Sequence, residues 1–217
     1  GFQGVSESSK DITSLGRGGS DLTAVALAAK FKADLCHIYT DVDGVMTADP
    51  RLIEQAETLP FLDWHEMSDL SQLGAKVMHE RACELAYKDQ VAFAVVNSLN
   101  EQAKASKIKE HIYEGSRIVG ITFKKDLSLI QIEWSKEKSI LAASTAISFF
   151  LTKGGKSIYS AKAREKEKNG PEYEGISDAI DEKELLSFLQ AKNLSPKKIS
   201  QKTINMACVV GANLTSN

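Results

Sequence analysis

Residues 91–96, Val-Ala-Phe-Ala-Val-Val, form an apolar run without any polar alternation. Such a run is typical of a strand that is buried on both faces of a parallel sheet, because a strand with one solvated face alternates apolar and polar residues. The helix and strand patterns that precede it cover residues 22–31 (helix), 35–39 (strand), 63–73 (helix) and 76–89 (helix). Strands alternate with helices through residues 1–100, which predicts an α/β domain with a largely parallel sheet.

A second set of patterns follows a polar, Lys-rich segment, residues 101–116, that we interpret as a linker. Its expected elements are strands at 117–123 and 127–134, a helix at 139–151, a strand at 156–161, a charged turn at 164–171, a strand at 173–180, a helix at 181–192 and a strand at 206–211. The order of strand, helix, two strands, helix and strand predicts a ferredoxin-like α+β domain over residues 117–217.

The distribution of charge also divides the chain. Residues 1–100 carry 8 Lys and Arg against 15 Asp and Glu, whereas residues 101–217 carry 19 against 14. A shift of this size supports two domains. The basic residues of the second half are interleaved with acidic ones and form no stripe flanked by aromatic residues, so we expect no nucleic-acid partner.

The chain shows no sign of a membrane or an oxidising compartment. No apolar run approaches the roughly 18 residues that a membrane-spanning helix needs, and the N-terminus has no signal-peptide pattern. The three cysteines, Cys36, Cys83 and Cys208, lie far apart and form no CxxC pair. An odd and scattered set is typical of reduced thiols, so we expect a cytoplasmic protein without membrane attachment.

Two partial metal motifs lack the residues that would complete them. Asp41-Val42-Asp43-Gly44 resembles the start of a calcium loop, but Met46 and Leu52 occupy the glycine and glutamate positions. His79-Glu80 begins a metalloprotease pattern, but Cys83 stands where the second histidine belongs. We therefore expect no metal site formed by protein side chains.

The segment Gly16-Arg17-Gly18-Gly19-Ser20-Asp21 precedes the first expected helix. Glycines at a helix start let backbone N–H groups approach an anion closely, and the helix dipole and the Arg17 guanidinium add positive potential. An ordinary glycine-rich turn that ends in a Ser20 or Asp21 cap remains an equally good interpretation of these residues.

A second polar segment, residues 39–51, follows the expected strand at 35–39. Open α/β sheets bind their ligands at the carboxyl ends of strands, and this segment is rich in groups that can bond a base, a ribose or phosphate oxygens. The alternative is a solvated loop held by local turns of its Asp residues.

Together these segments resemble a known family. Gly16-Arg17-Gly18-Gly19-Ser20-Asp21, then Tyr39-Thr40-Asp41-Val42-Asp43-Gly44-Val45 with Thr47-Ala48-Asp49-Pro50-Arg51, then Leu73-Gly74-Ala75-Lys76-Val77-Met78-His79 with Arg81, look like successive signatures of the aspartokinases. This family lies within the amino-acid kinase superfamily, and the resemblance covers residues 1–100, as the C-terminal part of the catalytic domain.

The second half is similar to the tandem ACT regulatory region of the same family. Residues 118–122 and 129–132 look like the first strands of one ACT unit, and residues 207–212 look like the opening strand of a second unit that is incomplete at Asn217. The resemblance implies regulation by an amino-acid effector, lysine or threonine, and a homo-oligomer formed through ACT units. Residues 134–138 replace the usual Asp-x-Pro-Gly turn of an ACT unit, and we name no effector residues.

The reaction that the resemblance implies is transfer of the γ-phosphoryl group of ATP to the side-chain carboxylate of L-aspartate, the first step of lysine, threonine and methionine synthesis. Mg²⁺ would be bound through the nucleotide phosphates. The implied aspartate pocket is formed by Arg17, Gly18, Gly19, Ser20 and Asp21, with Arg17 and Asp21 as catalytic residues. Arg17 would pair with a carboxylate of the substrate, and Asp21 would hold its ammonium group or orient a catalytic lysine.

The implied ATP pocket is formed by Tyr39, Thr40, Asp41, Thr47, Asp49, Pro50, Arg51 and Lys76. Without the resemblance, Lys76 would be read as a surface lysine after a glycine. The lysine-glycine segment that the family carries near its N-terminus is absent from this sequence, so we expect no kinase activity from this polypeptide alone. Two other interpretations remain: a non-catalytic amino-acid-binding or dimerisation module, and a superfamily member that phosphorylates a different acid.

Overall fold

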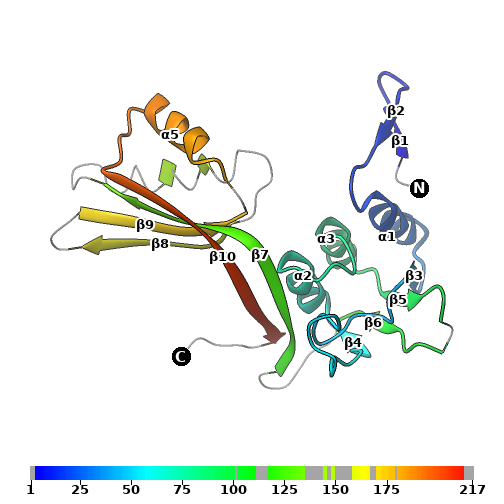
Figure 1. Cartoon of the computed structure of the whole chain (residues 1–217). Coiled ribbons are helices and arrows are strands. Elements are labelled where there is room, and N and C mark those ends of the chain that lie inside the picture. The colour runs from blue at the N-terminus through cyan, green and yellow to red at the C-terminus, as the bar shows by residue number, and fades with distance from the viewer. Residues whose placement is uncertain are drawn as a thin grey trace. The chain divides into compact units, whose positions relative to one another are not determined.

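The computed structural model describes residues 3–100, 102–110, 117–134, 144–145, 148–149, 158–166, 170–178 and 180–212. The chain forms two compact units, one of Gly1–Phe123 with Ala207–Asn217 and the other of Lys124–Met206. Figure 1 labels the elements of both. None of the helices within the described ranges has the length and apolar character that a membrane span requires.

The first unit is built on a four-stranded sheet in the order β3-β5-β6-β4. Its strands are β3 (Cys36–Thr40), β4 (Phe61–Leu62), β5 (Phe93–Asn97) and β6 (Ser106–Ile108). β3 pairs with β5 in parallel, as does β4 with β6, but β5 and β6 are antiparallel, so the sheet is mixed. β6 lies inside the segment expected to be a linker. It is a strand because Ser106 and Ile108 are buried and its backbone pairs on both sides.

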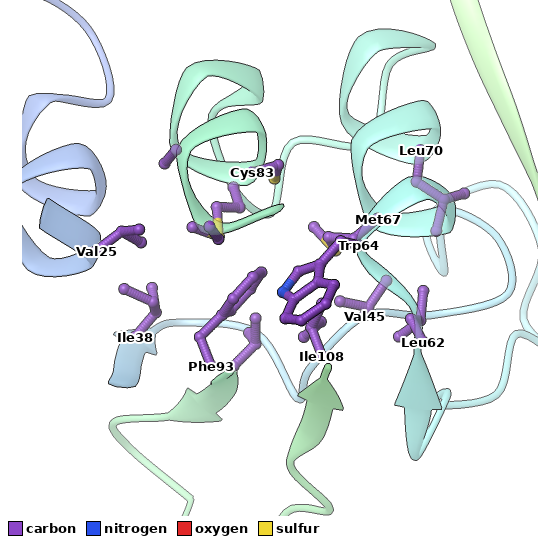
Figure 2. Packing of buried hydrophobic residues seen from close by; sticks show 14 of the residues in the cluster. Val25, Ile38, Val45, Leu62, Trp64, Met67, Leu70, Cys83, Phe93 and Ile108 are labelled. Carbon is purple, nitrogen blue, oxygen red and sulfur yellow. The ribbon is translucent and has the colours of Figure 1, made fainter. Parts of the chain in front are cut away.

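Three helices cover one face of this sheet: α1 (Gly19–Phe31), α2 (Trp64–Gln72) and α3 (Glu80–Lys88). Figure 2 shows their apolar side chains meeting those of the strands, with Val25 above Ile38 and the α2 residues above Leu62 and Ile108. The indole N–H of Trp64 donates a 3.0 Å hydrogen bond to the carbonyl of Val91, which anchors α2 beside β5.

The helix expected at 76–89 is shorter than predicted, because its first four residues are not helical. Gly74 has a φ of 121° and turns the chain after α2. The helix begins only after His79, which has an extended backbone and is the N-cap residue. Its imidazole Nδ1 caps the first turn by accepting a 3.4 Å hydrogen bond from the N–H of Arg81. The segment 74–79 is therefore a non-helical connection between α2 and α3.

A short antiparallel hairpin, β1 (Gln3–Val5) and β2 (Ile12–Ser14), precedes the glycine-rich segment and projects beyond α1 (Figure 1). It was not predicted, because residues 6–14 are polar and both strands are only three residues long. Lys10 adopts a left-handed φ of 62° at its turn.

The second unit contains a four-stranded sheet in the order β10-β7-β9-β8, to which β7 (Arg117–Glu133) and β10 (Lys198–Ala212) also bring residues of the first unit. β8 (Ile158–Lys166) and β7 both pair with β9 (Gly170–Ser177) in antiparallel fashion. Helix α5 (Glu182–Ala191) buries Leu185 and Leu189 against the sheet residues Ile130, Ile132 and Tyr173. The unit is a mixed α/β arrangement.

Several boundaries in this unit differ from those expected. β7 is one continuous strand instead of two, although Asp126 has a φ of 58° within it. The expected charged turn at 164–171 is strand at both ends, because β8 and β9 pair up to Lys166 and Gly170. The last strand begins at Lys198, eight residues before the expected start at 206. Of the helix expected at 139–151, only residues 144–145 and 148–149 are described, and these are helical; the rest lies outside the described residues.

Candidate functional site

The N-terminus of α1 has no side-chain cap. Gly18 is the N-cap residue, with φ 71° and ψ 13°, and the helix begins at Gly19. Ser20 and Asp21 therefore lie inside the first turn and cap nothing, so the interpretation of this segment as an ordinary Ser or Asp cap is wrong. The first N–H bonded within the helix is that of Leu22, to the carbonyl of Gly18 at 3.0 Å. The N–H groups of Ser20 and Asp21 are left at the positive end of the helix dipole, where an anion binds favourably.

Gly18 is required here by its neighbour as well as by its backbone. A Cβ built on Gly18 would lie 2.3 Å from the Cβ of His79, which is closer than two carbon atoms can approach. Its φ of 71° is also in the left-handed region that side chains rarely adopt. Gly16 shares the left-handed conformation, with φ 77°, but a Cβ there would meet open space.

The side chain of Arg81, in the first helical turn of α3, bonds main-chain carbonyls of the glycine-rich segment. Its Nη2 donates to the carbonyl of Leu15 at 2.7 Å and to that of Arg17 at 3.5 Å. The two acceptors flank Gly16 and lie 66 and 64 residues earlier in the sequence. The glycine turn is therefore held against the start of α3 by its contact with His79 and by the hydrogen bonds from Arg81.

Arg17 and Asp21 are placed differently. Arg17 is exposed, and its guanidinium makes no hydrogen bond or ion pair with the residues that the structure describes. Asp21 is half-buried on the side of α1 that packs on α3. Burial raises the pKa of the Cys83 thiol to about 11, and the nearby Asp21 carboxylate adds to the rise. A cation and a carboxylate thus stand four residues apart at the start of one helix.

The second segment begins where β3 ends, beside the end of its parallel neighbour β5. The carbonyl of Thr40 accepts from the N–H of Ser98 at 2.7 Å and from its hydroxyl at 2.9 Å. The side-chain amide of Asn97 donates to a carboxylate oxygen of Asp43. Asn97 and Ser98 were missed by the sequence reasoning, although polar residues directly after an apolar strand were the signal that could have identified them.

Hydrogen bonds of both its backbone and its side chain hold Thr47 in place. Thr47 exchanges bonds with Glu57, its hydroxyl accepting from the Glu57 N–H at 3.0 Å and its own N–H donating to the Glu57 carbonyl at 2.9 Å. The carbonyl of Thr47 accepts from the N–H of Ile121, in β7, at 2.8 Å. These bonds set the path of the loop, and they occupy the Thr47 hydroxyl oxygen as an acceptor.

Asp49, Pro50 and Arg51 form a local turn with an ion pair. Arg51 donates to Asp49 from Nε at 2.9 Å and from Nη2 at 2.8 Å, and the Arg51 N–H bonds the same carboxylate at 3.0 Å. Side-chain and backbone hydrogen bonds from Arg51 lower the pKa of Asp49, and the positive charge of Lys76 contributes further. Lys76 therefore lies close enough to this turn to affect its electrostatics, while its side chain is exposed.

Tyr39 and Asp41 lie at the surface on either side of Thr40. The Tyr39 ring is 65% exposed and packs edge-on against His37, with ring centroids 6.0 Å apart. Asp41 accepts a 3.2 Å hydrogen bond from the Thr40 hydroxyl. Both side chains are accessible to a ligand.

Residues 74–81 interact with both segments. Lys76 influences Asp49 in the strand-end loop, while His79 and Arg81 contact the glycine turn. Within the described residues, no hydrogen bond or ion pair joins the turn to the loop directly. A groove of about 310 Å³ between α1 and α3 is lined by Leu22, Arg81, Glu84, Leu85 and Lys88, none of which was predicted as a site residue. Among the residues that the structure describes, no three His, Cys, Asp or Glu side chains form a group able to hold a metal ion.

Comparison with known proteins identifies the relatives of this chain. Residues 1–97 match the model of the amino acid kinase family. An aspartokinase of Rickettsia felis is 37% identical over 187 residues, which are 85% of this chain and 44% of that protein. Aspartokinase 2 of Bacillus subtilis is 47% identical over 133 residues, which are 61% of this chain and 32% of that protein. The chain thus spans less than half the length of these relatives.

Solved structures agree with this assignment at the level of the fold. Aspartate kinase of Clostridium acetobutylicum superposes with a TM-score of 0.76 at 26% identity, covering 97% of this chain and 49% of that one. Residues 1–97 therefore resemble the amino acid kinase family, and the relatives that match this chain are aspartokinases.

Proposed function

We propose that this chain is the part of an aspartokinase that holds L-aspartate at the glycine turn and ATP at the strand-end loop. The observation that carries the proposal is the uncapped N-terminus of α1, with the exposed guanidinium of Arg17 beside it. A helix start without a side-chain cap presents N–H groups to an anion, and a neighbouring arginine can bind a carboxylate through two parallel hydrogen bonds. The aspartokinase relatives supply the identity of that anion.

On the substrate side, Gly18, Gly19 and Ser20 line the turn, and Arg17 pairs with a carboxylate of L-aspartate. Asp21 repels an anion, so its role is to hold the substrate ammonium or to orient a lysine. Its half-buried position on α1 keeps the carboxylate near the turn. Together Arg17 and Asp21 match the opposite charges of a free amino acid.

On the nucleotide side, the exposed Tyr39 ring can stack on a base, and Thr40 and Asp41 offer bonds to the ribose. Asp49, Pro50 and Arg51 form the turn nearest Lys76, whose ammonium binds phosphate as a point charge. Thr47 fixes the path of this loop through its bonds to Glu57. Mg²⁺ enters bound to the phosphates of ATP and neutralises part of their charge.

The chemistry asks these residues chiefly for positioning and charge neutralisation. An oxygen of the substrate's side-chain carboxylate attacks the γ-phosphorus, the bond from that phosphorus to the β,γ-bridging oxygen breaks, and ADP leaves with the electron pair. The product is the acyl phosphate 4-phospho-L-aspartate. Arg17 and Lys76 reduce the repulsion between the two anions before the bond forms.

We further propose that residues 117–217 form an ACT-type regulatory region that binds lysine or threonine and joins copies of the protein into a homo-oligomer. The order of elements in the second unit supports this, because two antiparallel strands and α5 follow β7 and precede β10. Residues 1–100, together with β6 of the segment 101–116, form the catalytic part.

The test is titration of the purified chain with L-aspartate and with MgATP in a calorimeter. Arg17→Ala is expected to weaken aspartate binding roughly tenfold or more, because a charged hydrogen bond contributes about 1.5–3 kcal/mol, and to leave ATP binding unchanged. Lys76→Ala is expected to do the reverse. Lys30→Ala, in the last turn of α1, is the matched control for loss of a positive charge.

Turnover is measured in parallel as aspartate-dependent ADP release, with hydroxylamine present to trap the acyl phosphate. Binding of lysine without any binding of ATP or aspartate would contradict the kinase proposal and favour a non-catalytic amino-acid-binding module. Binding of ATP with a different amino acid in place of aspartate would point to another acid as substrate.

A further inference from the structure

We propose that Arg81 is a positioning residue that orients the glycine turn for its ligand, acting together with His79. The inference rests on the proposed function of that turn. Arg81 is exposed at the start of α3 and belongs to neither of the two pockets proposed above. It acts on the substrate site through the main chain of another segment.

The first step of the argument is the direction of the peptide groups. The carbonyls of Leu15 and Arg17 both point to the Nη2 atom of Arg81, at 2.7 and 3.5 Å. In a trans peptide the N–H of the next residue points opposite to the carbonyl. The N–H groups of Gly16 and Gly18 are therefore directed away from α3.

These two N–H groups differ in their hydrogen bonding. That of Gly16 donates to the Ser14 hydroxyl at 3.1 Å, which closes the turn on its other side. That of Gly18, the N-cap residue of α1, makes no hydrogen bond within the described residues. The hydrogen bonds from Arg81 thus add the Gly18 N–H to the donors that the start of α1 presents to an anion.

The second step is the need for a restraint on the glycine turn. Gly16 and Gly18 both have a left-handed φ, and glycine populates left-handed and right-handed conformations about equally in a flexible chain. A segment with glycines at 16, 18 and 19 would otherwise sample many orientations of these peptide groups. Arg81 restrains the carbonyls on one side, and the His79 side chain packs against Gly18 so that this residue cannot move toward α3.

The third step is charge. The guanidinium of Arg81 forms no ion pair with the described residues, so its positive charge is not cancelled locally. It adds to the potential of the α1 N-terminus and of Arg17 without touching the ligand. A carboxylate bound at the turn is therefore attracted by Arg81 and held by donors that Arg81 has oriented.

The experiment compares Arg81→Ala and Arg81→Lys with the unaltered chain, and Lys88→Ala in the last turn of α3 is the matched control for charge loss on the same helix. Hydrogen exchange of a peptide covering residues 13–22 reports the order of the turn. Calorimetry reports the dissociation constants for L-aspartate and for MgATP. Circular dichroism and the thermal midpoint show whether each variant is folded.

In Arg81→Ala we expect exchange in residues 16–21 to accelerate roughly tenfold or more, because the turn loses its long-range restraint. Aspartate affinity should fall by a similar factor while ATP affinity stays within twofold. Arg81→Lys should recover most of both, because a single nitrogen atom makes both hydrogen bonds and an ammonium group has three donors. Lys88→Ala should behave like the unaltered chain.

Unchanged exchange in Arg81→Ala would overturn the proposal, as would faster exchange with no change in aspartate affinity. Equal losses in Arg81→Ala and Lys88→Ala would overturn it too, since they would indicate a general charge effect. If the unaltered chain binds no aspartate, the proposed function fails by itself, and the exchange data still decide whether Arg81 orders the turn.

Discussion

The N–H of Ile121 donates a 2.8 Å hydrogen bond to the carbonyl oxygen of Thr47, joining the first part of β7 to the strand-end loop. The neighbouring Gly120 lies so close that a Cβ on it would stand 2.8 Å from the same oxygen. The strand that begins the region resembling a regulatory unit is thus bonded to the loop that we propose for ATP. A displacement of β7 at Ile121 would move or break this hydrogen bond to Thr47.

Gly120→Ala should therefore disturb the loop. The new methyl group meets a backbone oxygen, which cannot rotate away, so either Thr47 or β7 must shift, at a cost of about 1–3 kcal/mol in the free energy of unfolding. ATP affinity should fall with it. Urea unfolding and calorimetry measure the two effects. Gly4→Ala is the control, because its Cβ would lie at an ordinary 3.5 Å from Thr13 Oγ1; equal stability of both variants would show that the Gly120 contact is not tight.

Gly18→Ala should be more damaging than Gly16→Ala. Both substitutions place a side chain at a left-handed φ, which costs about 1–2 kcal/mol. Only the Gly18 variant also drives a methyl group into the Cβ of His79. The difference between their unfolding free energies isolates this contact, and we expect about 1–3 kcal/mol. Aspartate affinity should fall further in Gly18→Ala, and identical behaviour of the two variants would argue against close packing of His79 on the turn.

The Asp49–Arg51 pair predicts a specific response to acid. Hydrogen bonds from Arg51 hold the pKa of Asp49 below its ordinary value of 3.8. A depressed pKa contributes stability above pH 3.8 that is lost as the pH falls through the lower, folded-state value. In Arg51→Ala the pKa of Asp49, followed by carboxyl carbon NMR, should rise toward 3.8. An unchanged titration curve would mean that Arg51 does not pair with Asp49 in solution.

The raised pKa of the Cys83 thiol predicts that the unfolding free energy falls at alkaline pH. The thiol is fully buried, and burial raises its pKa from 9.0 to about 11. The unfolded chain therefore loses this proton first, so the stability contribution is complete below pH 9.0 and is lost between pH 9.0 and about 11. Over that window the unfolding free energy should fall about 1.4 kcal/mol per pH unit more steeply than in Cys83→Ser.

Measurement of urea midpoints for both proteins at several pH values provides this comparison, and the subtraction removes the other groups that titrate there. Parallel slopes would show that Cys83 ionises equally well in the folded chain. Alkylation with iodoacetamide at pH 8 should correspondingly leave Cys83 unmodified until the chain is unfolded.

Local patterns were sufficient for much of the first unit. The expected helix at 22–31, the strand at 35–39 and the helix at 63–73 correspond to α1, β3 and α2 with shifts of up to three residues, because each has a clear apolar period and turn residues at its ends. β4, β6 and the β1–β2 hairpin were not predicted. Strands of two or three residues are too short to show a period, and they exist only because distant backbone groups pair with them.

The same division holds for the candidate site. The sequence by itself determined which residues are candidates for the chemistry, because glycines, an arginine and acidic residues at a helix start and a strand end have properties that do not depend on distant contacts. Only the tertiary structure decided that Ser20 and Asp21 are not caps, that Asn97 bonds Asp43, and that Arg81 bonds the carbonyls of the turn. The acceptors of Arg81 lie 64 and 66 residues away, and no local pattern encodes a hydrogen bond between segments that meet only when α1 packs on α3.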